Sequence, residues 1–454
     1  MQKLFDEVAS LDDRCYKEFY LSEDILMEHA AEGMAEYIRN NFKKKSKVTI
    51  VCGSGDNGAD GLALGRLIHG DFDVSLFCAK TPKSKMALLQ KQRSLSIGVK
   101  ESTKLLECDI LVDAIVGTGF SGEFDKEMLT LIEQMNSLRA FKIACDVPSG
   151  YLFRADLTLA MGALKKRMFL DESKECVGEI KVINLGVCRD IYEGKSNCYL
   201  LDLEDLKLPN RTKKSSHKGS YGHLAVASGE KSGASIMSAL SALRFGSGLV
   251  TLVGFENIST PYSIMYSHEV PKTTTALALG MGLGVEFSNI ELDKFLNNTH
   301  SMVVDADMFY MPIIIEILGR ENLVITPHPK EFVSLLKLTN LADISVNELQ
   351  KERFKYAEMF CRAYPKVTLL LKGANVIIAQ DKTFYVNPHG TQALAKGGSG
   401  DVLSGLIGAL LAQGYAPIDA AINGSLAHAK LALLYNGADF SLTPDDLIGA
   451  IGKL

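Results

Sequence analysis

The chain lacks the features that mark secreted and membrane proteins. Its nine cysteines form no Cys-x-x-Cys pair and eight of them precede residue 200, which argues for reduced thiols rather than a disulfide framework. Residues 1–7 contain no apolar segment typical of a signal peptide. No uncharged apolar run is long enough to span a membrane. We therefore predict a cytoplasmic protein with no membrane partner.

An excess of charge of either sign is also absent. The chain has 49 Lys and Arg against 54 Asp and Glu, so its composition suggests no nucleic-acid partner. Apolar residues make up 47% and charged residues 23%, which is typical of globular proteins. A length of 454 residues is too great for one ordinary core. We expect two or three domains that bind small molecules, and a homo-oligomer.

The segment that most constrains the function is Lys-Gly-Gly-Ser-Gly-Asp at 396–401. It precedes the small, apolar segment 402–411, which we interpret as a buried helix. Glycines let the backbone approach a ligand closely, and the first N–H groups of the helix would face an anion. A carboxylate repels a phosphate, so Asp401 fits better as a base that takes a proton from a hydroxyl. The alternative is an ordinary glycine-rich turn with an acidic N-cap.

A second glycine-rich segment follows a predicted strand at 47–52. Residues 53–61 read Gly-Ser-Gly-Asp-Asn-Gly-Ala-Asp-Gly, and we predict a helix from Leu62 to His69. Strand, turn and helix begin a βαβ unit, and the glycine spacing fits a dinucleotide-binding fingerprint. A dehydrogenase would place an acid after the next strand, 73–78, where this chain has Ala79-Lys80. The sequence therefore favours a nucleotide-like ligand over an ordinary NAD-dependent dehydrogenase.

Polar loops follow two further predicted strands of this half. Strand 109–112 leads into Asp-Ala-Ile-Val-Gly-Thr-Gly at 113–119, and strand 142–145 leads into Asp-Val-Pro-Ser-Gly at 146–150. Ligands bind at the carboxyl ends of strands in open α/β sheets. We therefore expect these two loops to form one site with residues 53–61.

These three loops resemble those of the NAD(P)H-hydrate epimerase domain, the YjeF N-terminal type. The resemblance implies a Rossmann-like domain in residues 1–205 that interconverts the epimers of hydrated NADH and NADPH. It implies Asp146 as the catalytic acid/base and a K⁺ ion, which suits oxygen ligands, on Asn57, Asp113 and Ser149. The residues implied to contact the hydrated nucleotide are Asp56, Asn57, Gly58, Ala59, Asp60, Gly117, Thr118, Gly119 and Asp146. At 56–60 the family usually has Asn-Asn-Gly-Gly-Asp instead of Asp-Asn-Gly-Ala-Asp.

The polar segment 206–218 has no apolar periodicity, and we interpret it as a linker. Beyond it, predicted strands again alternate with predicted helices. This alternation predicts a doubly wound, mainly parallel sheet in residues 219–454.

The second half resembles the NAD(P)H-hydrate dehydratase branch of the ribokinase-like superfamily. The motifs that carry this resemblance lie at 217–222, 280–284, 305–307, 326–331, 372–375 and 397–401. The resemblance implies that Asp401 is the base and that Ala234, Gly284, His328 and Asp401 contact the hydrated nucleotide. The residues implied to bind ADP or AMP are Lys372, Gly373, Ala374, Asn375, Val376 and Gly400. Lys330 stands where the family usually has Gly.

Together the two halves resemble the bifunctional NAD(P)H-hydrate repair enzymes. The resemblance implies that the first domain epimerises the R and S forms of hydrated NAD(P)H. The second would dehydrate the S form with ADP and Mg²⁺, giving NAD(P)H, AMP and phosphate. Either ADP or ATP is compatible with these residues. The alternatives are a vitamin or sugar kinase with an accessory domain, and a non-catalytic nucleotide-binding scaffold.

Overall fold

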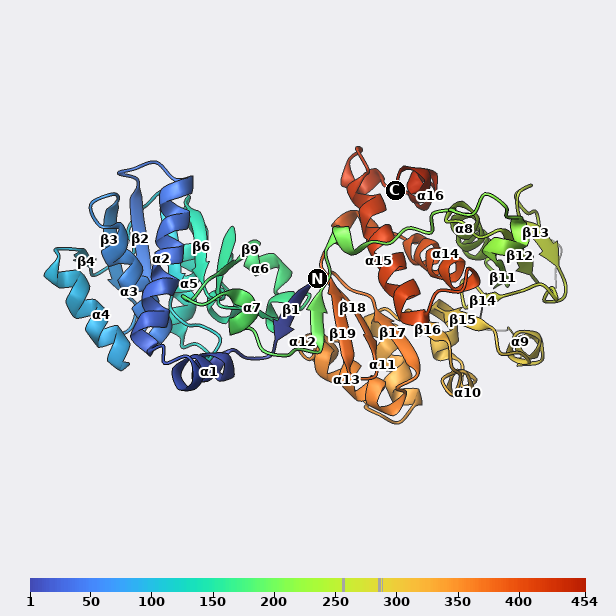
Figure 1. Cartoon of the computed structure of the whole chain (residues 1–454), viewed down its shortest axis with the longest axis horizontal. Coiled ribbons are helices and arrows are strands. Elements are labelled where there is room, and N and C mark those ends of the chain that lie inside the picture. The colour runs from blue at the N-terminus through green and yellow to red at the C-terminus, as the bar shows by residue number, and fades with distance from the viewer. Residues whose placement is uncertain (255–257, 285–286, 288) are drawn as a thin grey trace. The chain divides into compact units, whose positions relative to one another are not determined.

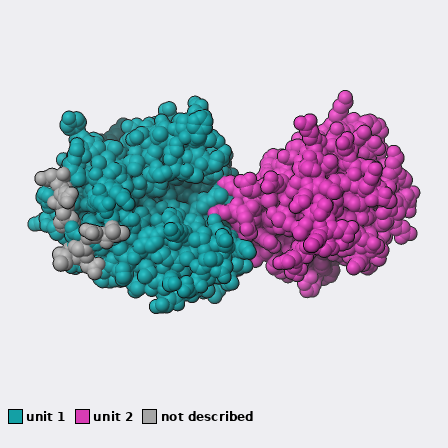
Figure 2. Space-filling model, turned by 180° about the vertical axis from the view of Figure 1, so that it is seen from behind, with its two compact units in different colours: residues 1, 197–454 teal, residues 2–196 magenta. Residues whose placement is uncertain are grey.

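The computed structural model describes residues 1–254, 258–284, 287 and 289–454. They form two compact units, the first of residues 2–196 and the second of residue 1 with residues 197–454 (Figure 2). Both units combine helices with a largely parallel sheet, which confirms the predicted two-domain α/β fold (Figure 1). No helix within the described ranges is long and apolar enough to cross a membrane.

The main sheet of the first unit is parallel throughout, in the order β4-β3-β2-β5-β6-β7-β9. A short parallel pair, β1 with β8, lies apart from it. The strands are β1 (Gln2–Phe5), β2 (Lys47–Cys52), β3 (Asp73–Cys78), β4 (Lys100–Ser102), β5 (Ile110–Ala114), β6 (Phe141–Cys145), β7 (Leu157–Met161), β8 (Leu164–Lys165) and β9 (Glu179–Ile183). The helices are α1 (Ala9–Glu18), α2 (Glu23–Asn41), α3 (Asp56–Ile68), α4 (Lys85–Ser96), α5 (Lys126–Ser137), α6 (Lys174–Val177) and α7 (Arg189–Tyr192).

The central strands are apolar on both faces because helices cover both. In β2, Ile50 packs into a core shared with α2 and α3, whereas the next residue, Val51, packs into a second core shared with α5. In β5, Val112 likewise packs into the core shared with α2 and α3, and Leu111 packs into the core shared with α5. Successive side chains of a strand point to opposite faces, so continuous apolar runs indicate a sheet buried between two helix layers.

Helix α3 begins earlier than the sequence predicted. Its first residue is Asp56, six residues before the predicted start at Leu62. The glycines of this segment serve close packing rather than a longer loop, because a Cβ at Gly58 would lie 2.2 Å from the Gly53 carbonyl oxygen and one at Gly61 would lie 2.6 Å from Ala114 Cβ. Residues 56–60 therefore occupy the first turns of a helix, with their N–H groups at its positive end.

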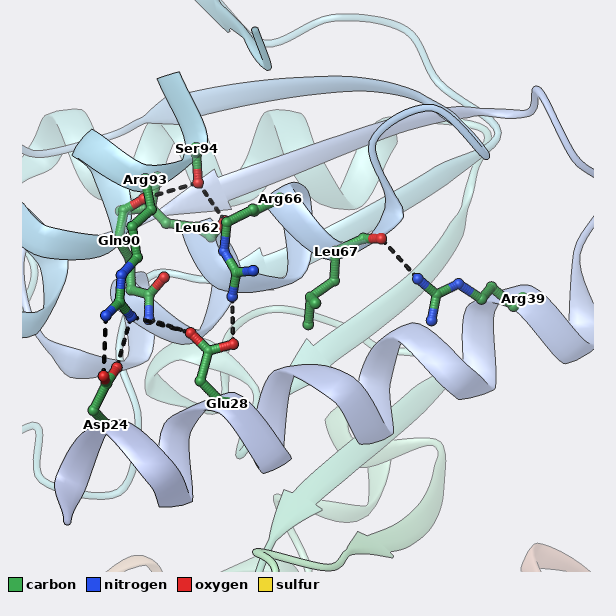
Figure 3. A network of polar contacts seen from close by, with 9 residues as sticks. All are labelled: Asp24, Glu28, Arg39, Leu62, Arg66, Leu67, Gln90, Arg93 and Ser94. Atoms are coloured by element: carbon green, nitrogen blue, oxygen red, sulfur yellow. Dashed lines mark hydrogen bonds and ion pairs between the residues drawn. The ribbon is translucent and has the colours of Figure 1, made fainter. Parts of the chain in front are cut away.

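One carboxylate ties α2 to two neighbouring helices (Figure 3). Glu28 of α2 pairs with Arg66 of α3, and its Oε1 accepts hydrogen bonds from Gln90 Nε2 (2.9 Å) and Arg93 Nη1 (3.2 Å) of α4. Arg93 also donates two bonds to Asp24 (2.7 and 3.0 Å). The network fixes α2 and α4 around α3, whose N-terminus reaches the candidate site.

The sheet of the second unit is parallel except at β18, which runs antiparallel to both its neighbours. Its order is β13-β12-β11-β14-β15-β16-β17-β18-β19-β10. The strands are β10 (Cys198–Leu200), β11 (His223–Ala227), β12 (Leu249–Val253), β13 (Met265–Ser267), β14 (Ala276–Leu279), β15 (Ser301–Val304), β16 (Leu323–Ile325), β17 (Val367–Leu371), β18 (Val376–Gln380) and β19 (Thr383–Asn387). This arrangement confirms the mainly parallel sheet.

Helix α14 packs against both α8 and α15, and the three helices share a core with β11, β14 and β15 (Figure 1). Small residues allow this close packing: a Cβ at Gly405 of α14 would lie 2.2 Å from the Ser238 carbonyl oxygen of α8. The helices of this unit are α8 (Ser232–Arg244), α9 (Asn289–Leu296), α10 (Ile314–Ile317), α11 (Pro329–Leu338), α12 (Val346–Lys351), α13 (Arg353–Ala363), α14 (Ser399–Ala412), α15 (Pro417–Leu433) and α16 (Pro444–Ala450).

The division between the units precedes residue 205, where we predicted the first domain to end. Strand β10 pairs with β19, so the chain joins the second unit's sheet directly after residue 196. The segment predicted as a linker has no helix or strand from 206 to 217. It nevertheless belongs to the second unit, because Leu206 and Leu208 pack on its core and the Lys207 N–H donates to Asn423 Oδ1 (2.6 Å). Polar composition did not reveal this packing.

Candidate active sites

The three loops of the first unit meet as predicted because β2, β5 and β6 are adjacent and parallel. Their carboxyl ends lie at one edge of the sheet, where ligands bind in such folds. The Gly53 N–H donates to the Ala114 carbonyl (2.9 Å), and a Cβ on Gly53 would lie 1.8 Å from the Ile115 carbonyl oxygen. Glycine is therefore required for the first loop to approach the second.

Asp113 and Ser149 form the buried base of this site. Ser149 Oγ donates to Asp113 Oδ1 (2.6 Å), and the Ser149 N–H donates to Asp113 Oδ2 (2.8 Å). Burial raises the pKa of Asp113 to about 6, although these hydrogen bonds oppose the rise. A carboxylate held in this way, with no protein cation paired to it in the described part of the chain, can accept a bound cation.

Asn57 supplies an amide to the same edge. Its side-chain Oδ1 and Nδ2 are both buried and have no hydrogen-bond partner among the described residues. A Cβ on Gly117 would lie 3.5 Å from Asn57 Oδ1 and 3.2 Å from Asp146 Oδ2, so Gly117 leaves space between the two side chains. An unpaired buried amide is costly unless a ligand satisfies it, and oxygen donors of this kind fit a hard cation.

Asp146 is the most constrained acid of the first site. Its backbone has φ +68°, the left-handed region that is uncommon for a residue with a side chain. Its Oδ2 accepts from Thr118 Oγ1 (2.6 Å) and its Oδ1 pairs with the ammonium of Lys165. Burial favours the protonated acid, but the charge and hydrogen bond of Lys165, together with the hydrogen bond from Thr118, outweigh it and lower the pKa of Asp146. Asp146 is therefore held ionised.

The remaining predicted contacts divide between the site and the packing around it. Asp60 lies near Asp146, and burial followed by the Asp146 charge raises its pKa well above the ordinary value. The pKa values of the two carboxyl groups are thus shifted in opposite directions, as those of an acid and a base would be. Ala59 is fully buried with Met27 and Met86, so its side chain serves the packing of α3. Asp56 and Gly119 are exposed.

Sequence reasoning missed Lys165. This lysine is fully buried and donates to the Met161 carbonyl (2.9 Å) as well as to Asp146. A buried lysine is rare unless it is paired. The available signal was a lysine that directly follows the apolar pair Ala163-Leu164 without a turn residue between them.

The second site is organised around Asp305, at the carboxyl end of β15. Its Oδ1 accepts from Lys372 Nζ (2.6 Å) and its Oδ2 accepts from Ser404 Oγ of α14 (2.7 Å). A Cβ on Gly400 would lie 3.3 Å from Lys372 Nζ, so the glycine-rich segment is next to this pair. Asp305 belongs to a motif that we recognised, but we did not predict it as a site residue.

The glycine-rich segment forms the N-terminus of α14 as predicted. Gly398 is the N-cap with φ +88°, and Asp401 is the third residue of the helix. The N–H groups of Gly400 and Asp401 have no backbone acceptor among the described residues, so they are available to an anion. Burial, then the negative charge of Asp305, raises the pKa of Asp401 to about 6, which Lys372 opposes. A base with this pKa is ionised at neutral pH and can still take up a proton.

The residues predicted to contact the hydrated nucleotide lie at neighbouring strand ends. Gly284 follows β14 with φ +85°, and its N–H donates to Asp307 Oδ2 (2.9 Å). Ala234 of α8 lies beside this loop, 3.1 Å from where a Cβ on Gly282 would be. Asp307, which accepts the Gly284 N–H, also helps to raise the pKa of Asp401, so this loop lies near the second site's acid.

His328 has a structural role that the sequence did not predict. Its Nδ1 accepts hydrogen bonds from the N–H groups of Lys330 (3.1 Å) and Glu331 (3.2 Å), so it is the N-cap of α11. Its Nε2 lies 3.2 Å from Glu331 Oε1, and its side chain remains 44% exposed and able to meet a ligand. Lys330 contributes its backbone N–H to this cap, a group that glycine would also provide.

The turn at 372–375 joins β17 to β18 beside His328. The Lys372 N–H donates to the Pro327 carbonyl (2.9 Å), and Gly373 and Ala374 are exposed. Asn375 is buried. The turn is close to the glycine-rich segment through its first residue, because the Lys372 ammonium is a neighbour of Gly400.

His428 of α15 is a second buried group that the sequence did not assign. Its Nε2 lies 3.0 Å from Ser399 Oγ in the glycine-rich segment. Burial, then the charge of Lys372, lowers the pKa of His428 to about 4, so the ring is neutral at physiological pH. Its contact with Ser399 supports the first turn of α14.

Comparisons with known proteins agree with this arrangement of two sites. Residues 224–452 match the family described as NAD(P)H-hydrate dehydratase, and residues 23–167 match the YjeF-related protein N-terminus. The chain is 44% identical to the bifunctional NAD(P)H-hydrate repair enzyme Nnr of Helicobacter pylori, with all of both chains covered. The chain belongs to the bifunctional NAD(P)H-hydrate repair enzymes. This membership confirms the resemblance predicted from the loop motifs.

Two further similar proteins show lower sequence identity to this chain. The Escherichia coli enzyme of the same name is 30% identical over 90% of this chain and 84% of its own. Among solved structures, the ADP/ATP-dependent NAD(P)H-hydrate dehydratase from Bacillus subtilis, co-crystallised with ATP/Mg²⁺, is 28% identical. The match covers 54% of this chain and 92% of that one, with a TM-score of 0.47.

Proposed function

We propose that the protein repairs hydrated NADH and NADPH in two steps, one in each unit. The first unit interconverts the R and S epimers, and the second dehydrates the S form with ADP, giving NAD(P)H, AMP and phosphate. The observation that carries the proposal is that each unit of this family member holds a candidate catalytic acid near the carboxyl ends of its parallel strands. Asp146 directly follows β6, and Asp401 lies in the first turn of α14, where the charge of Asp305 at the end of β15 raises its pKa. The two acids act on different steps.

In the second site, Asp401 takes the proton of the substrate hydroxyl. The hydroxyl oxygen bonds to the terminal phosphorus of ADP as the bond from that phosphorus to the bridging oxygen breaks, which releases AMP. The N–H groups of Gly400 and Asp401 hold the transferring group, and Mg²⁺ bound with ADP supplies further neutralisation of its charge. Phosphate then leaves with the C–O electrons, assisted by the lone pair of the ring nitrogen, and loss of a ring proton restores the reduced nicotinamide.

The proposal assigns the other residues to two groups. Lys372 to Val376 hold ADP, and Ala234, Gly284 and His328 hold the hydrated nucleotide. In the first unit Asp146 is the acid/base, and the substrate contacts are those of 56–60 and 117–119 that face the site. A cytoplasmic location and a homo-oligomeric state stay predictions of the sequence.

The direct test is recovery of the reduced-ring absorbance from hydrated NADH. With ADP or ATP present, the enzyme should restore the absorbance of NADH and release AMP or ADP respectively, in equal amounts with phosphate. A vitamin or sugar kinase would instead leave a stable phosphorylated product. Absence of recovery with both nucleotides would contradict the proposal.

A K⁺ ion held by Asn57, Asp113 and Ser149 is also part of the proposal. The unpaired amide of Asn57 and the buried carboxylate of Asp113 support it. Exchanging K⁺ for tetramethylammonium should slow epimerisation by about tenfold or more and lower the unfolding temperature, because the ion stabilises the folded state by mass action. Asn57→Leu should remove both responses. A wild-type unfolding temperature that does not change with K⁺ would contradict the K⁺ site.

Lys165 should determine the pH at which the first site works. Lysine at this position holds the pKa of Asp146 low, so Lys165→Met should let burial raise that pKa. The acid limb of the epimerase pH profile should move to higher pH, and the rate at neutral pH should fall roughly tenfold for each unit by which the pKa then exceeds the assay pH. Lys166→Met, which removes a pair with exposed Asp6 (2.9 Å), is the matched control. An unmoved profile in K165M would refute this role.

A further inference from the structure

Arg353 is the largest fully buried side chain among the described residues. It is the first residue of α13, and its guanidinium points at the turn between β17 and β18. Its Nη1 donates to the Asn375 carbonyl (2.9 Å), and its Nη2 donates to the carbonyls of Lys372 (2.8 Å) and Leu371 (3.2 Å). One planar group thus joins both ends of a four-residue turn. Burying a guanidinium is costly unless its donors are satisfied, and the turn supplies acceptors for both Nη groups.

The same turn is held on its other side by the second site. The Lys372 N–H donates to the Pro327 carbonyl, and Lys372 Nζ donates to Asp305 Oδ1. Lys372 is therefore anchored through its N–H, its carbonyl and its ammonium, and the carbonyl anchor is Arg353. If that anchor is lost, the turn can shift while the other two contacts persist. A shift of about 1 Å is enough to misplace a binding group.

We propose that Arg353 is a positioning residue for the nucleotide site. It holds the turn at 372–375 from the side of α13, so that the backbone and the Lys372 ammonium meet ADP without reordering. The inference rests on the proposed function, which assigns ADP to this turn. Lysine at 353 would keep the charge but could not span three carbonyls in one plane, because an ammonium lacks the planar fork of donors.

Arg320 offers a matched control in the same unit. Its guanidinium also donates to main-chain carbonyls, those of Leu296 (2.9 Å) and Asn298 (2.5 Å). These carbonyls precede β15, at the opposite end of the strand from Asp305. Arg320→Lys therefore repeats the chemical change away from the nucleotide site.

The experiment compares R353K and R320K in the full-length enzyme. R353K should raise the KM for ADP about tenfold or more, while the KM for hydrated NADH and the epimerase rate stay within twofold. Amide hydrogen exchange at residues 373–376, measured without substrate, should accelerate in R353K and not in R320K. R320K should keep the wild-type KM for ADP.

Three outcomes would overturn the inference. They are an unchanged KM for ADP with unchanged exchange in folded R353K, an equal rise in KM for ADP in R320K, and loss of the second unit's fold in R353K alone. Failure of the proposed function would look different, because the wild type itself would then restore no NADH. Exchange at the turn would still test Arg353 in that case.

Discussion

Replacing Asp401 with Asn should lower the rate of NADH recovery by about 10²- to 10⁴-fold and leave epimerisation unchanged, since this is the range that a general base contributes. Asparagine has the same shape and can still lie in the first turn of α14, but its amide cannot take up the hydroxyl proton. The N–H groups of the glycine-rich segment would remain in place. The measurement is the absorbance recovery from the S epimer with ADP, alongside the epimerisation rate of the same preparation.

A matched control separates the loss of a base from the loss of an acid at a helix start. Asp446 is also the third residue of its helix, α16, where it accepts the Thr443 N–H (2.9 Å). Asp446→Asn removes the same charge from an equivalent position and should keep both activities. If D401N retains more than a tenth of the wild-type rate, Asp401 is not the base.

Replacing Asp146 with Asn should have the converse effect. Epimerisation should fall by about 10²- to 10⁴-fold, while dehydration of pure S epimer proceeds at the wild-type rate. Asparagine tolerates the left-handed backbone that Asp146 adopts, so the loop should keep its shape. The neutral amide would leave Lys165 without its buried carboxylate, and the first site without its acid/base.

Asp381 serves as the control for this substitution. It also has a left-handed backbone, with φ +52°, in the exposed turn between β18 and β19. Asp381→Asn should change neither rate. Wild-type epimerisation in D146N, or an equal loss of dehydration in it, would contradict the assignment of Asp146 to the first step alone.

Much of this architecture could be predicted because it depends on local pattern. Apolar runs followed by polar loops located β2, β5 and β6, and the adjacency of parallel strands then brought their loops together. The glycine-rich segment at 398–401 was recognisable because a backbone that meets an anion needs residues without a side chain in specific positions. These features can be predicted without knowing which distant residues are in contact.

The features that sequence could not predict depend on contacts between distant residues. Lys165 meets Asp146 only because β7 pairs with β6, which brings the segment after β7 beside the loop after β6. Arg353 meets the 372–375 turn only because α13 packs beside β17 and β18. The early start of α3 has a similar cause, since Gly61 packs against Ala114 of β5. The glycines there could equally have signalled a longer loop.

The most direct test of two serial sites uses the pure R epimer of hydrated NADH with ADP. After subtraction of the rate without enzyme, D146N alone and D401N alone should each restore little NADH. An equimolar mixture of the two variants should restore it at a rate approaching the wild type, because each supplies the step that the other lacks. A mixture no faster than the single variants would contradict the account.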